Sequence, residues 1–581
     1  MASPKLKMWV PWSELIGSPH GTVEEFRTIL GKYAPSSLLK ASARLSVAFN
    51  YGLEGRTVAD TATTLKWIPE LFTPDVMEKT RSFTGQDRPL FFQAQLRYLD
   101  AEVIRLNPAS SEGLPVVPNH MLGEILLRAG ELLYKPHVQL ADEYDAMANL
   151  IAEFLPTYEI TSPMDPFFQF LRFYIFLTKI IPKMAAHLKL FDVNVEFEKL
   201  FGFSLGRYTN FIASVALHAQ QARKTTTSPD AAINASFQQI WFKNTTLTVE
   251  EIEQMFKTVC FSLAELAPQS DPIGYADFEF LRDRPYLLHE HEMFLLDYEF
   301  ALTKLESAVV WRILRTLPEK KKLDSLSFWG YVFEEYVTWL FDIYASKTLN
   351  VVHKSPTYIE NGNTKQLCDV VIVCGSTAIM IEAKLATCPV GVKYSADYLK
   401  MRKYLEDKLV TGTGTRRVGV SQLLNAIHII VKVPEQFSLW LPGIKKLIPV
   451  IVTKDDIGSS WVVNAYLNRR FKDQLNNKKH KKYVVTPLVS MSISSMERLM
   501  WALKDKPFSE IVEQRIQSDK ALASPFEAAS DFVAQGVAPK LHAHVEAYKE
   551  LADELVKDFG MEKGDVGQLE ITDDLKAKVV P

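Results

Sequence analysis

Two apolar runs joined by a short turn, QLCDVVIVCGSTAIMIEAKLATC (366–388), constrain the fold of this chain more than any other stretch. Both runs are short and rich in Val and Ile, and a Gly-Ser pair separates them, so they predict two neighbouring antiparallel strands. Each run also contains one acid, Asp369 in the first and Glu382 in the second, and Lys384 follows Glu382 closely. Charged side chains are costly to bury, so their presence in such strands needs a chemical reason.

The three charged groups are expected to meet at one end of a small sheet. Alternate residues of a strand share a face, so Glu382 and Lys384 point the same way, roughly 7 Å apart along the strand. Asp369 lies on the neighbouring strand. A divalent cation such as Mg²⁺ or Mn²⁺ offsets the cost of desolvating two carboxylates, because it prefers hard oxygen ligands. The D-x12-E-x-K spacing therefore fits metal-assisted hydrolysis of a phosphodiester.

A plainer interpretation of these residues stays open. Asp369 would then cap a turn at the end of its strand. Glu382 and Lys384 would form an ion pair on one face of an edge strand, with no ligand between them.

The sequence around these strands mixes helix and strand patterns. A long apolar helix is expected at 327–345, before the first strand. The β-branched runs predict strands at 349–359, 367–373, 377–385, 446–453 and 483–493. Amphipathic helices are expected at 395–410 and 419–431, with a further capped helix starting at Ser494. Together these elements predict an α/β (α+β) domain over residues 327–505.

The remainder of the chain has a different character. Residues 1–317 are dominated by helical periodicity and predict a large all-α N-terminal domain. The polar stretch 318–326 is expected to be a linker. Residues 506–581 predict a helical C-terminal extension that ends in a loose tail.

Composition excludes several classes of protein. With 581 residues and a net charge of −3, the chain is too long for one core and is not a globally basic nucleic-acid coat. Its four cysteines form no CxxC pair, which argues against a zinc ribbon. The N-terminus lacks the apolar region of a signal peptide, and the most apolar segments are broken by charged residues and Pro. We therefore expect a cytoplasmic protein without a membrane partner.

Asp369 followed by Glu382-Ala383-Lys384 resembles the core motif of the PD-(D/E)XK nuclease superfamily, which has the restriction-endonuclease-like fold. The order helix, three strands, helix, strand is similar to that family's core and covers about 180 residues. The literal Pro of the motif is missing, because Cys368 precedes Asp369.

Two helices extend the resemblance. GYVFEEYV (330–337) is similar to the family's first helix, where Glu334 would be an additional acidic metal ligand, although its neighbour Glu335 is an alternative. Gly330, one turn earlier, would let this helix approach the site closely. GVSQLLNAI (419–427) resembles the later helix, from which Gln422 would face the site.

The resemblance implies a metal-dependent endonuclease. Asp369, Glu382 and the carbonyl of Ala383 would hold Mg²⁺, with Mn²⁺ as an alternative, and Glu334 would be an outer or second-metal ligand. Lys384 would orient water or stabilise the charge of the transition state, and Gln422 would assist.

Duplex DNA is the common substrate among similar nucleases, so we expect DNA, with RNA cleavage as an alternative. A non-catalytic nucleic-acid-binding or scaffold protein on a degenerate nuclease fold is a second alternative. By analogy with bacterial anti-phage defence proteins, the N-terminal helices would serve recognition, dimerisation or regulation, either in a homodimer or with a defence-system partner.

A basic segment, NRRFKDQLNNKKHKKY (468–483), carries a formal charge of +6 in a chain that is net negative. A solvated loop and a phosphate-contacting arm are both compatible with it. The residues expected to contact nucleic acid are Arg469, Arg470, Lys478, Lys479, Lys481 and Lys482 in this segment, and Arg416 and Arg417 after a GTGT turn.

Overall fold

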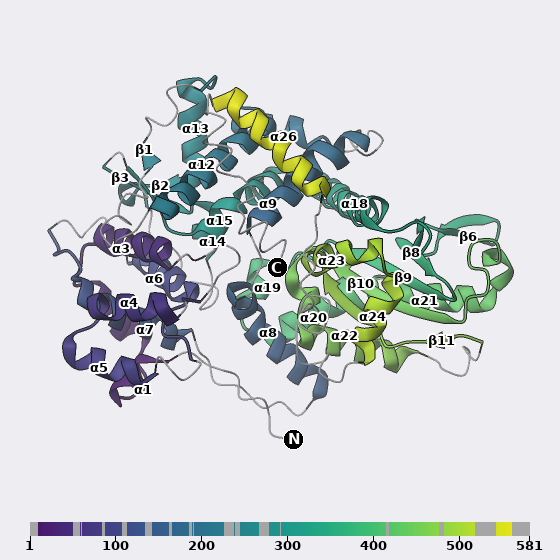
Figure 1. The fold of residues 1–581 in the computed structure, drawn as a ribbon, viewed down its shortest axis with the longest axis horizontal. Coiled ribbons are helices and arrows are strands. Elements are labelled where there is room, and N and C mark those ends of the chain that lie inside the picture. Colours follow the sequence, from purple (N-terminus) through teal and green to yellow (C-terminus); the bar gives the residue numbers. More distant parts are fainter. Residues whose placement is uncertain are drawn as a thin grey trace.

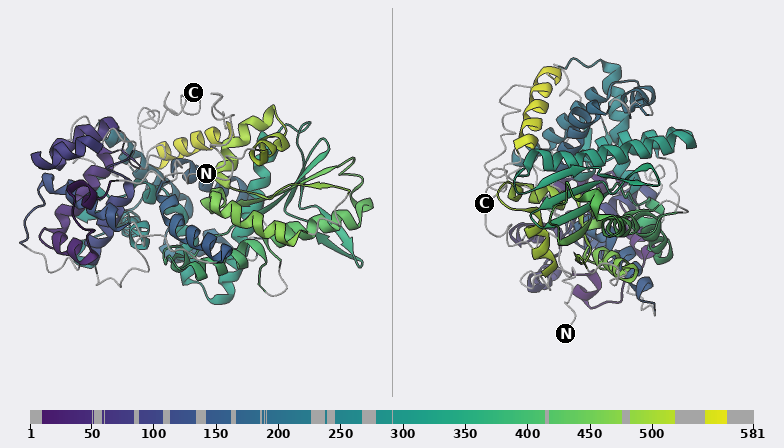
Figure 2. Two further views of the ribbon diagram at one scale, coloured as in Figure 1. Left: turned by 90° about the horizontal axis from the view of Figure 1, so that it is seen from below. Right: turned by 90° about the vertical axis from the view of Figure 1, so that its right-hand side faces the viewer.

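The computed structural model places a body of N-terminal helices at one end of the molecule and a six-stranded mixed sheet at the other (Figure 1). Figure 2 shows the same arrangement from two further sides. The structure describes residues 10–49, 51, 58–59, 61–83, 88–106, 113–133, 142–161, 166–184, 187, 189, 191–225, 237–238, 245–266, 278–290, 292–413, 417–475, 482–517 and 542–559.

The six-stranded sheet has the order β11-β10-β9-β8-β5, and β12 pairs with β10 beyond the end of β11. Its strands are β5 (Val351–Lys354), β8 (Val370–Cys374), β9 (Thr377–Lys384), β10 (Lys446–Thr453), β11 (Val484–Val485) and β12 (Val489–Ser492). β8 is antiparallel to both β5 and β9, whereas β10 is parallel to β9, β11 and β12. A separate hairpin of β6 (Thr357–Glu360) and β7 (Asn363–Gln366) follows β5. The predicted pairing of the two opening strands is confirmed.

Helices cover both faces of this sheet, which explains why β9 and β10 are almost continuously apolar. α18 (Glu319–Tyr344) and α24 (Phe508–Gln517) pack on the face that carries Ile379, Ile381 and Ala383. The opposite face carries Ala378 and Met380. It is covered by α20 (Tyr398–Leu405), π-helical η9 (Glu406–Val410), α21 (Gly419–Lys432) and α22 (Trp461–Gln474).

Three short 3-10 helices and two further α-helices complete this part of the molecule. These elements are α19 (Val390–Lys393), η10 (Pro434–Phe437), η11 (Asp456–Ser459), α23 (Ile493–Leu499) and η13 (Met500–Lys504). The α/β class predicted from the sequence is confirmed.

The first seven helices form a hydrophobic core that also includes later residues such as Phe261, Leu287 and Phe300. They are α1 (Trp12–Ile16), α2 (Val23–Leu30), α3 (Pro35–Ala48), α4 (Thr61–Leu71), α5 (Pro74–Phe83), α6 (Gln93–Arg105) and α7 (Asn119–Leu132). A four-stranded sheet of order β1-β4-β3-β2 adjoins them, built from β1 (Phe237–Gln238), β2 (Cys260–Phe261), β3 (Tyr286–His289) and β4 (Glu292–Leu295). The predicted all-α region therefore contains a sheet, whose strands of two to four residues are too short to show a period-2 pattern.

A second group of helices connects this body to the large sheet. It contains α8 (Glu143–Thr161), α9 (Pro166–Ile175), η3 (Phe176–Ile180), η4 (Ile181–Lys183), α11 (Val193–Phe201), α12 (Leu205–Thr225), α13 (Val249–Val259), η7 (Leu263–Glu265), α14 (Glu279–Asp283), α15 (Tyr298–Leu302), α16 (Lys304–Glu306), η8 (Ser307–Arg312) and α17 (Ile313–Thr316). Several of them share one hydrophobic core with α18 and the sheet. The structure thus has no separation of cores at residue 317.

The predicted linker at 318–326 is instead the beginning of α18, which starts at Glu319. Its first turns are polar because they lie at the surface, and this composition resembles a loop. At the other end of the chain, α26 (His542–Phe559) packs against α9 and α12, so part of the predicted C-terminal extension belongs to the folded molecule. The expected loose tail lies outside the described residues. In the described parts of the chain, we find no helix with the length and apolar character needed to cross a membrane.

Candidate active site

The register of β8 and β9 brings the three charged residues of the opening stretch together. Val370 pairs with Ile381, so Asp369, the residue before β8, lies opposite Glu382. Glu382 and Lys384 alternate with Ile381 and Ala383 and therefore share a face of the sheet with Asp369.

Hydrogen bonds fix this cluster. The backbone N–H of Ala383 donates to Asp369 Oδ2 at 2.8 Å. The Lys384 ammonium donates to Glu382 Oε2 at 2.6 Å and lies 3.6 Å from Asp369 Oδ2. Gln366, at the end of β7, donates to the other Asp369 oxygen at 3.1 Å. Sequence reasoning missed Gln366, for which the only signal was a polar side chain three residues before Asp369.

The electrostatics of the cluster are unbalanced. Glu382 is completely buried, and its Oε1 atom has no hydrogen-bond partner among the described residues. Burial raises the pKa of Glu382 to about 8; Lys384 opposes this rise, and Asp369 adds to it. Burial would lower the pKa of Lys384, but the two carboxylates outweigh it and raise that pKa. Two carboxylates thus share one ammonium group, which leaves a negative charge uncompensated when both are ionised.

The donor set fits a hard divalent cation. Asp369 and Glu382 supply carboxylate oxygens, and Mg²⁺ commonly binds through one or two carboxylates while keeping several waters. No group of three or more His, Cys, Asp or Glu residues with metal-binding geometry occurs in the described part of the chain. A cation here would therefore complete its coordination with backbone carbonyl and water oxygens.

The carbonyl of Ala383 is oriented toward Asp369. The Lys384 carbonyl accepts a hydrogen bond from the N–H of Lys454, so the amide groups of Lys384 face β10. Because amide directions alternate along a strand, those of Ala383 face the β8 side, where its N–H reaches Asp369. Ala383 lies beyond the paired part of β8, so its carbonyl is available as a ligand.

Glu334 lies on α18 near this cluster, and its negative charge is one of the contributions that raise the pKa of Lys384. Its neighbour Glu335 faces away, with its carboxylate 3.6 Å from the Lys354 ammonium. Gly330 does not have the predicted role, because a Cβ atom at this position would meet no atom within 4 Å. The helix therefore does not depend on glycine for its approach.

Gln422 lies on α21, which packs against β9 on the face of the three charged residues. Its side-chain oxygen accepts a hydrogen bond from the backbone N–H of Gly419 at 3.0 Å. Gln422 thus caps the start of its own helix and makes no hydrogen bond to Asp369, Glu382 or Lys384 in this structure.

Two of the predicted phosphate-contacting residues are engaged within the molecule. Arg470 of α22 donates to Glu406 at 2.8 Å and lies over the ring of Tyr144, 4.9 Å from its centroid. Arg469 lies 3.4 Å from Glu143 and 3.6 Å from Asp473. These contacts hold α22 to α8 and η9.

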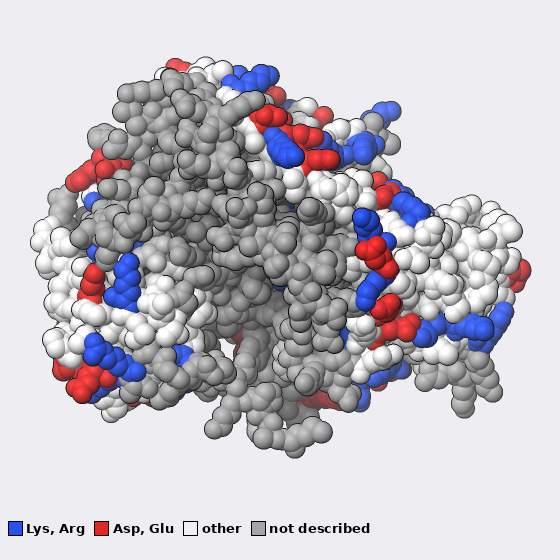
Figure 3. Space-filling view, viewed as in Figure 1, with Lys and Arg blue, Asp and Glu red and all other residues white. Residues whose placement is uncertain are grey.

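The other predicted contacts are exposed or undescribed. Arg417 is exposed and donates to Asn425, and Lys482 is exposed beside Tyr483. Arg416, Lys478, Lys479 and Lys481 lie outside the described residues. On the face in Figure 3, the coloured Lys and Arg side chains alternate with Asp and Glu. We see no broad basic stripe among the described residues of that face.

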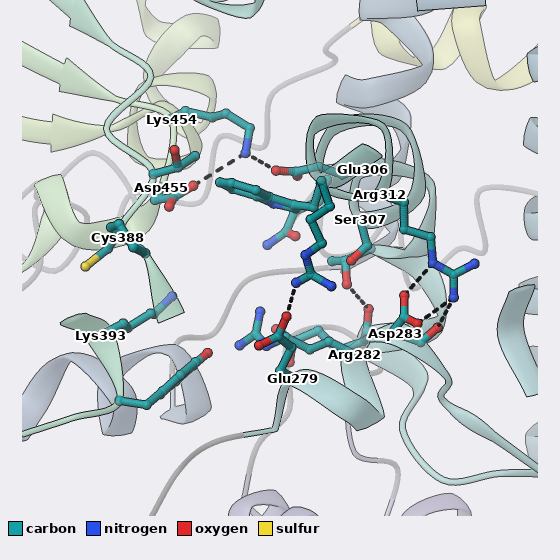
Figure 4. Close-up of a pocket in the computed structure, with 18 of the residues that line it drawn as sticks. Glu279, Arg282, Asp283, Glu306, Ser307, Arg312, Cys388, Lys393, Lys454 and Asp455 are labelled. Atoms are coloured by element: carbon teal, nitrogen blue, oxygen red, sulfur yellow. Dashed lines mark hydrogen bonds and ion pairs between the residues drawn. The ribbon is translucent and has the colours of Figure 1, made fainter. Parts of the chain in front are cut away.

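A cavity of about 200 Å³ lies near the carboxyl ends of β9 and β10, where the sheet meets α14, α16 and η8 (Figure 4). Two ion pairs line this cavity. Lys454 contacts Glu306, and Arg312 lies 2.6 Å from Asp283. Lys454 directly follows Thr453, the register partner of Lys384, and so points to the opposite face of the sheet. This cavity is therefore distinct from the carboxylate cluster.

The chain matches no protein-family model, no curated protein and no solved structure at a significant level.

Proposed function

We propose that this protein is a metal-dependent nuclease with a core of the restriction-endonuclease type, acting on duplex DNA. The observation that carries the proposal is the buried, partly unpartnered Glu382 beside Asp369 and Lys384. The order α18, β5, β8, β9, α21, β10 agrees with the helix, three strands, helix, strand arrangement of that core.

Each side chain has a chemical task in this proposal. Asp369, Glu382 and the Ala383 carbonyl would hold Mg²⁺ or Mn²⁺, with Glu334 as an outer acidic group. The cation would supply Lewis-acid charge and make water a better nucleophile at neutral pH. Lys384 stays protonated because the two carboxylates raise its pKa, so it donates a hydrogen bond to a phosphate oxygen and does not act as a base.

The test is a cleavage assay with supercoiled DNA, linear DNA and RNA, each with Mg²⁺, Mn²⁺ or EDTA. Metal-dependent cutting of DNA that is lost in Lys384→Ala supports the proposal. Cutting of RNA alone would show that the substrate assignment is wrong and the site assignment right. An unchanged rate in Lys384→Ala would remove the site assignment. If the protein cuts none of these substrates, a metal titration separates two explanations. A site that binds no metal favours a non-catalytic binding protein, whereas a site that binds metal favours an enzyme that lacks its activator.

A further inference from the structure

The N-terminal body contains a larger cavity that the proposed nuclease chemistry does not use. It has a volume of about 480 Å³ and lies between α3 and the β3–β4 hairpin, on the left of Figure 1. Sites for small molecules commonly have volumes of roughly 300–1,000 Å³. Its apolar wall includes Val116, Val117 and Phe294, and the surrounding core is separate from the cores that flank the large sheet.

Cationic side chains gather at one side of this cavity. Lys40 and Arg44 lie one helical turn apart on α3, and His289 faces them from β3. The Lys40 ammonium lies 5.2 Å from the centroid of the Phe294 ring and forms no ion pair with a described residue. Arg44 donates to Asn119, which also lines the cavity, at 2.8 Å. Two like charges thus lie one helical turn apart at this wall, and an anion that contacts both reduces their repulsion.

The pKa of His289 reflects the same positive charge. Burial lowers its pKa, and the nearby charge of Lys40 lowers it further, whereas Glu290 and Glu292 oppose the shift. Among the described residues that line the cavity, Glu292 is the one acid, against Lys40 and Arg44. The lining therefore favours a negatively charged ligand.

The start of α3 adds to this preference. The helix begins at Pro35 after Ala34, which has no side-chain acceptor, and its first turn contains no acid. Ser36 and Ser37 of this turn line the cavity. The positive end of the helix dipole therefore lies beside this cavity, while the N–H of Ser37 is paired with the Ala34 carbonyl.

We propose that this cavity binds a phosphorylated small molecule of nucleotide size. The phosphate lies against Lys40 and Arg44 on α3, and the apolar part packs on Val116, Val117 and Phe294. The proposal does not depend on the nuclease assignment, because the two sites share no residue.

Isothermal titration of the full chain with AMP and with adenosine, in EDTA, tests this site. We expect saturable binding of AMP and about tenfold or more weaker binding of adenosine, because charge-assisted hydrogen bonds to the phosphate are lost. Lys40→Gln should weaken AMP binding by about tenfold or more, whereas Lys40→Arg should keep most of it. Lys66→Gln, at an exposed position of α4 in the same body, is the matched control and should bind AMP normally.

Three results would overturn the proposal: no saturable binding of AMP, equal affinity for adenosine, or unchanged AMP affinity in Lys40→Gln. Arg44→Gln provides a second variant if Lys40→Gln does not fold, and it should weaken AMP binding without loss of the unfolding transition. Lys384→Ala should bind AMP like the wild type. Loss of AMP binding in that variant would place the ligand at the carboxylate cluster instead.

Discussion

At the scale of single residues, Asp369 has two separable roles. One oxygen accepts the hydrogen bond of Ala383 and so holds β8 and β9 in register at their ends, while its charge helps to keep Lys384 protonated and, in the proposed function, to hold a cation. The neutral amide of asparagine can still accept that hydrogen bond. A single substitution can therefore separate the structural role from the chemical one.

We predict that Asp369→Asn folds normally but loses metal-dependent cleavage by about 100-fold or more, the scale on which catalytic electrostatic groups act. Cleavage rates at saturating Mg²⁺ and the unfolding temperature are the two measurements. Gln366→Ala, which removes a neutral contact to the same carboxylate, is the milder comparison. If Asp369→Asn cuts at the wild-type rate, the negative charge of Asp369 is not needed for cleavage.

The sequence was sufficient to predict the convergence of Asp369, Glu382 and Lys384, because strand alternation and a two-residue turn leave one register. It was insufficient for Gln366, whose contact depends on how the β6–β7 hairpin folds back. It was also misleading for Gly330, since glycine in a helix has several possible reasons and only the space around it distinguishes them.

At the scale of elements, α18 connects the proposed site with the C-terminus. Tyr336 and Tyr344 of α18 contact the two ring nitrogens of His544 at 3.1 and 2.9 Å, and Phe168 stacks on that ring. His544 is almost completely buried, and burial lowers its pKa to about 4. The neutral imidazole thus docks α26 onto α18.

This docking should weaken in acid. Between the ordinary pKa of 6.5 and the folded value of about 4, the unfolded chain binds a proton that the folded chain does not, so stability falls as the pH falls. We predict a loss of about 2 kcal/mol from pH 7 to pH 5 that is attributable to His544. Urea unfolding of the wild type and of His544→Gln at both pH values measures it. Equal pH dependence in the two proteins would contradict the prediction.

The predicted linker at 318–326 shows why the sequence of a surface helix can be mistaken for a loop. Pro318 and the lysines of the first turns resemble a polar joint, yet α18 starts at Glu319 and its buried positions begin only at Ser325 and Phe328. The short strands β1 to β4 were missed because strands of two to four residues are too short to show a period-2 pattern.

At the scale of the whole molecule, the sheet is not an independent unit. One hydrophobic core includes Phe173 of α9, Tyr208 of α12, Phe333 of α18 and Ile381 of β9, and α8 packs on the other side against α20 and α22. Cutting the chain at the predicted domain boundary before residue 327 would remove α8, α9 and α12 and expose the apolar surfaces that they cover.

We therefore predict that a fragment of residues 327–505 lacks cooperative unfolding and binds a hydrophobic dye, whereas residues 10–559 fold. Near-ultraviolet circular dichroism and thermal unfolding of the two fragments are the measurements. A cooperative transition in the shorter fragment would mean that the contacts of α8, α9 and α12 are dispensable.

The basic segment gives a prediction for nucleic-acid binding by the full chain. Exchanging Lys478, Lys479, Lys481 and Lys482 for Gln should weaken DNA binding and reduce its salt dependence, because fewer counterions are released. Arg470→Gln is the control, since Arg470 is occupied by Glu406 and should change stability more than binding. If DNA binding by the lysine variant has the same salt dependence as that of the wild type, the segment is an ordinary loop that does not contact phosphates.

The contacts around His544 also set an order of events during synthesis. Arg172 of α9 holds Glu497 through two hydrogen bonds of 2.7 and 2.6 Å, Glu497 accepts from Tyr336, and Tyr336 meets His544. These partners are distributed over more than 370 residues of sequence, so the chain must close long loops before the network can form. A ribosome delivers His544 long after α9 and α18 have been made. The helix that carries Glu334 therefore gains this support only after residue 544 has been synthesised, and a product terminated before that residue would lack it.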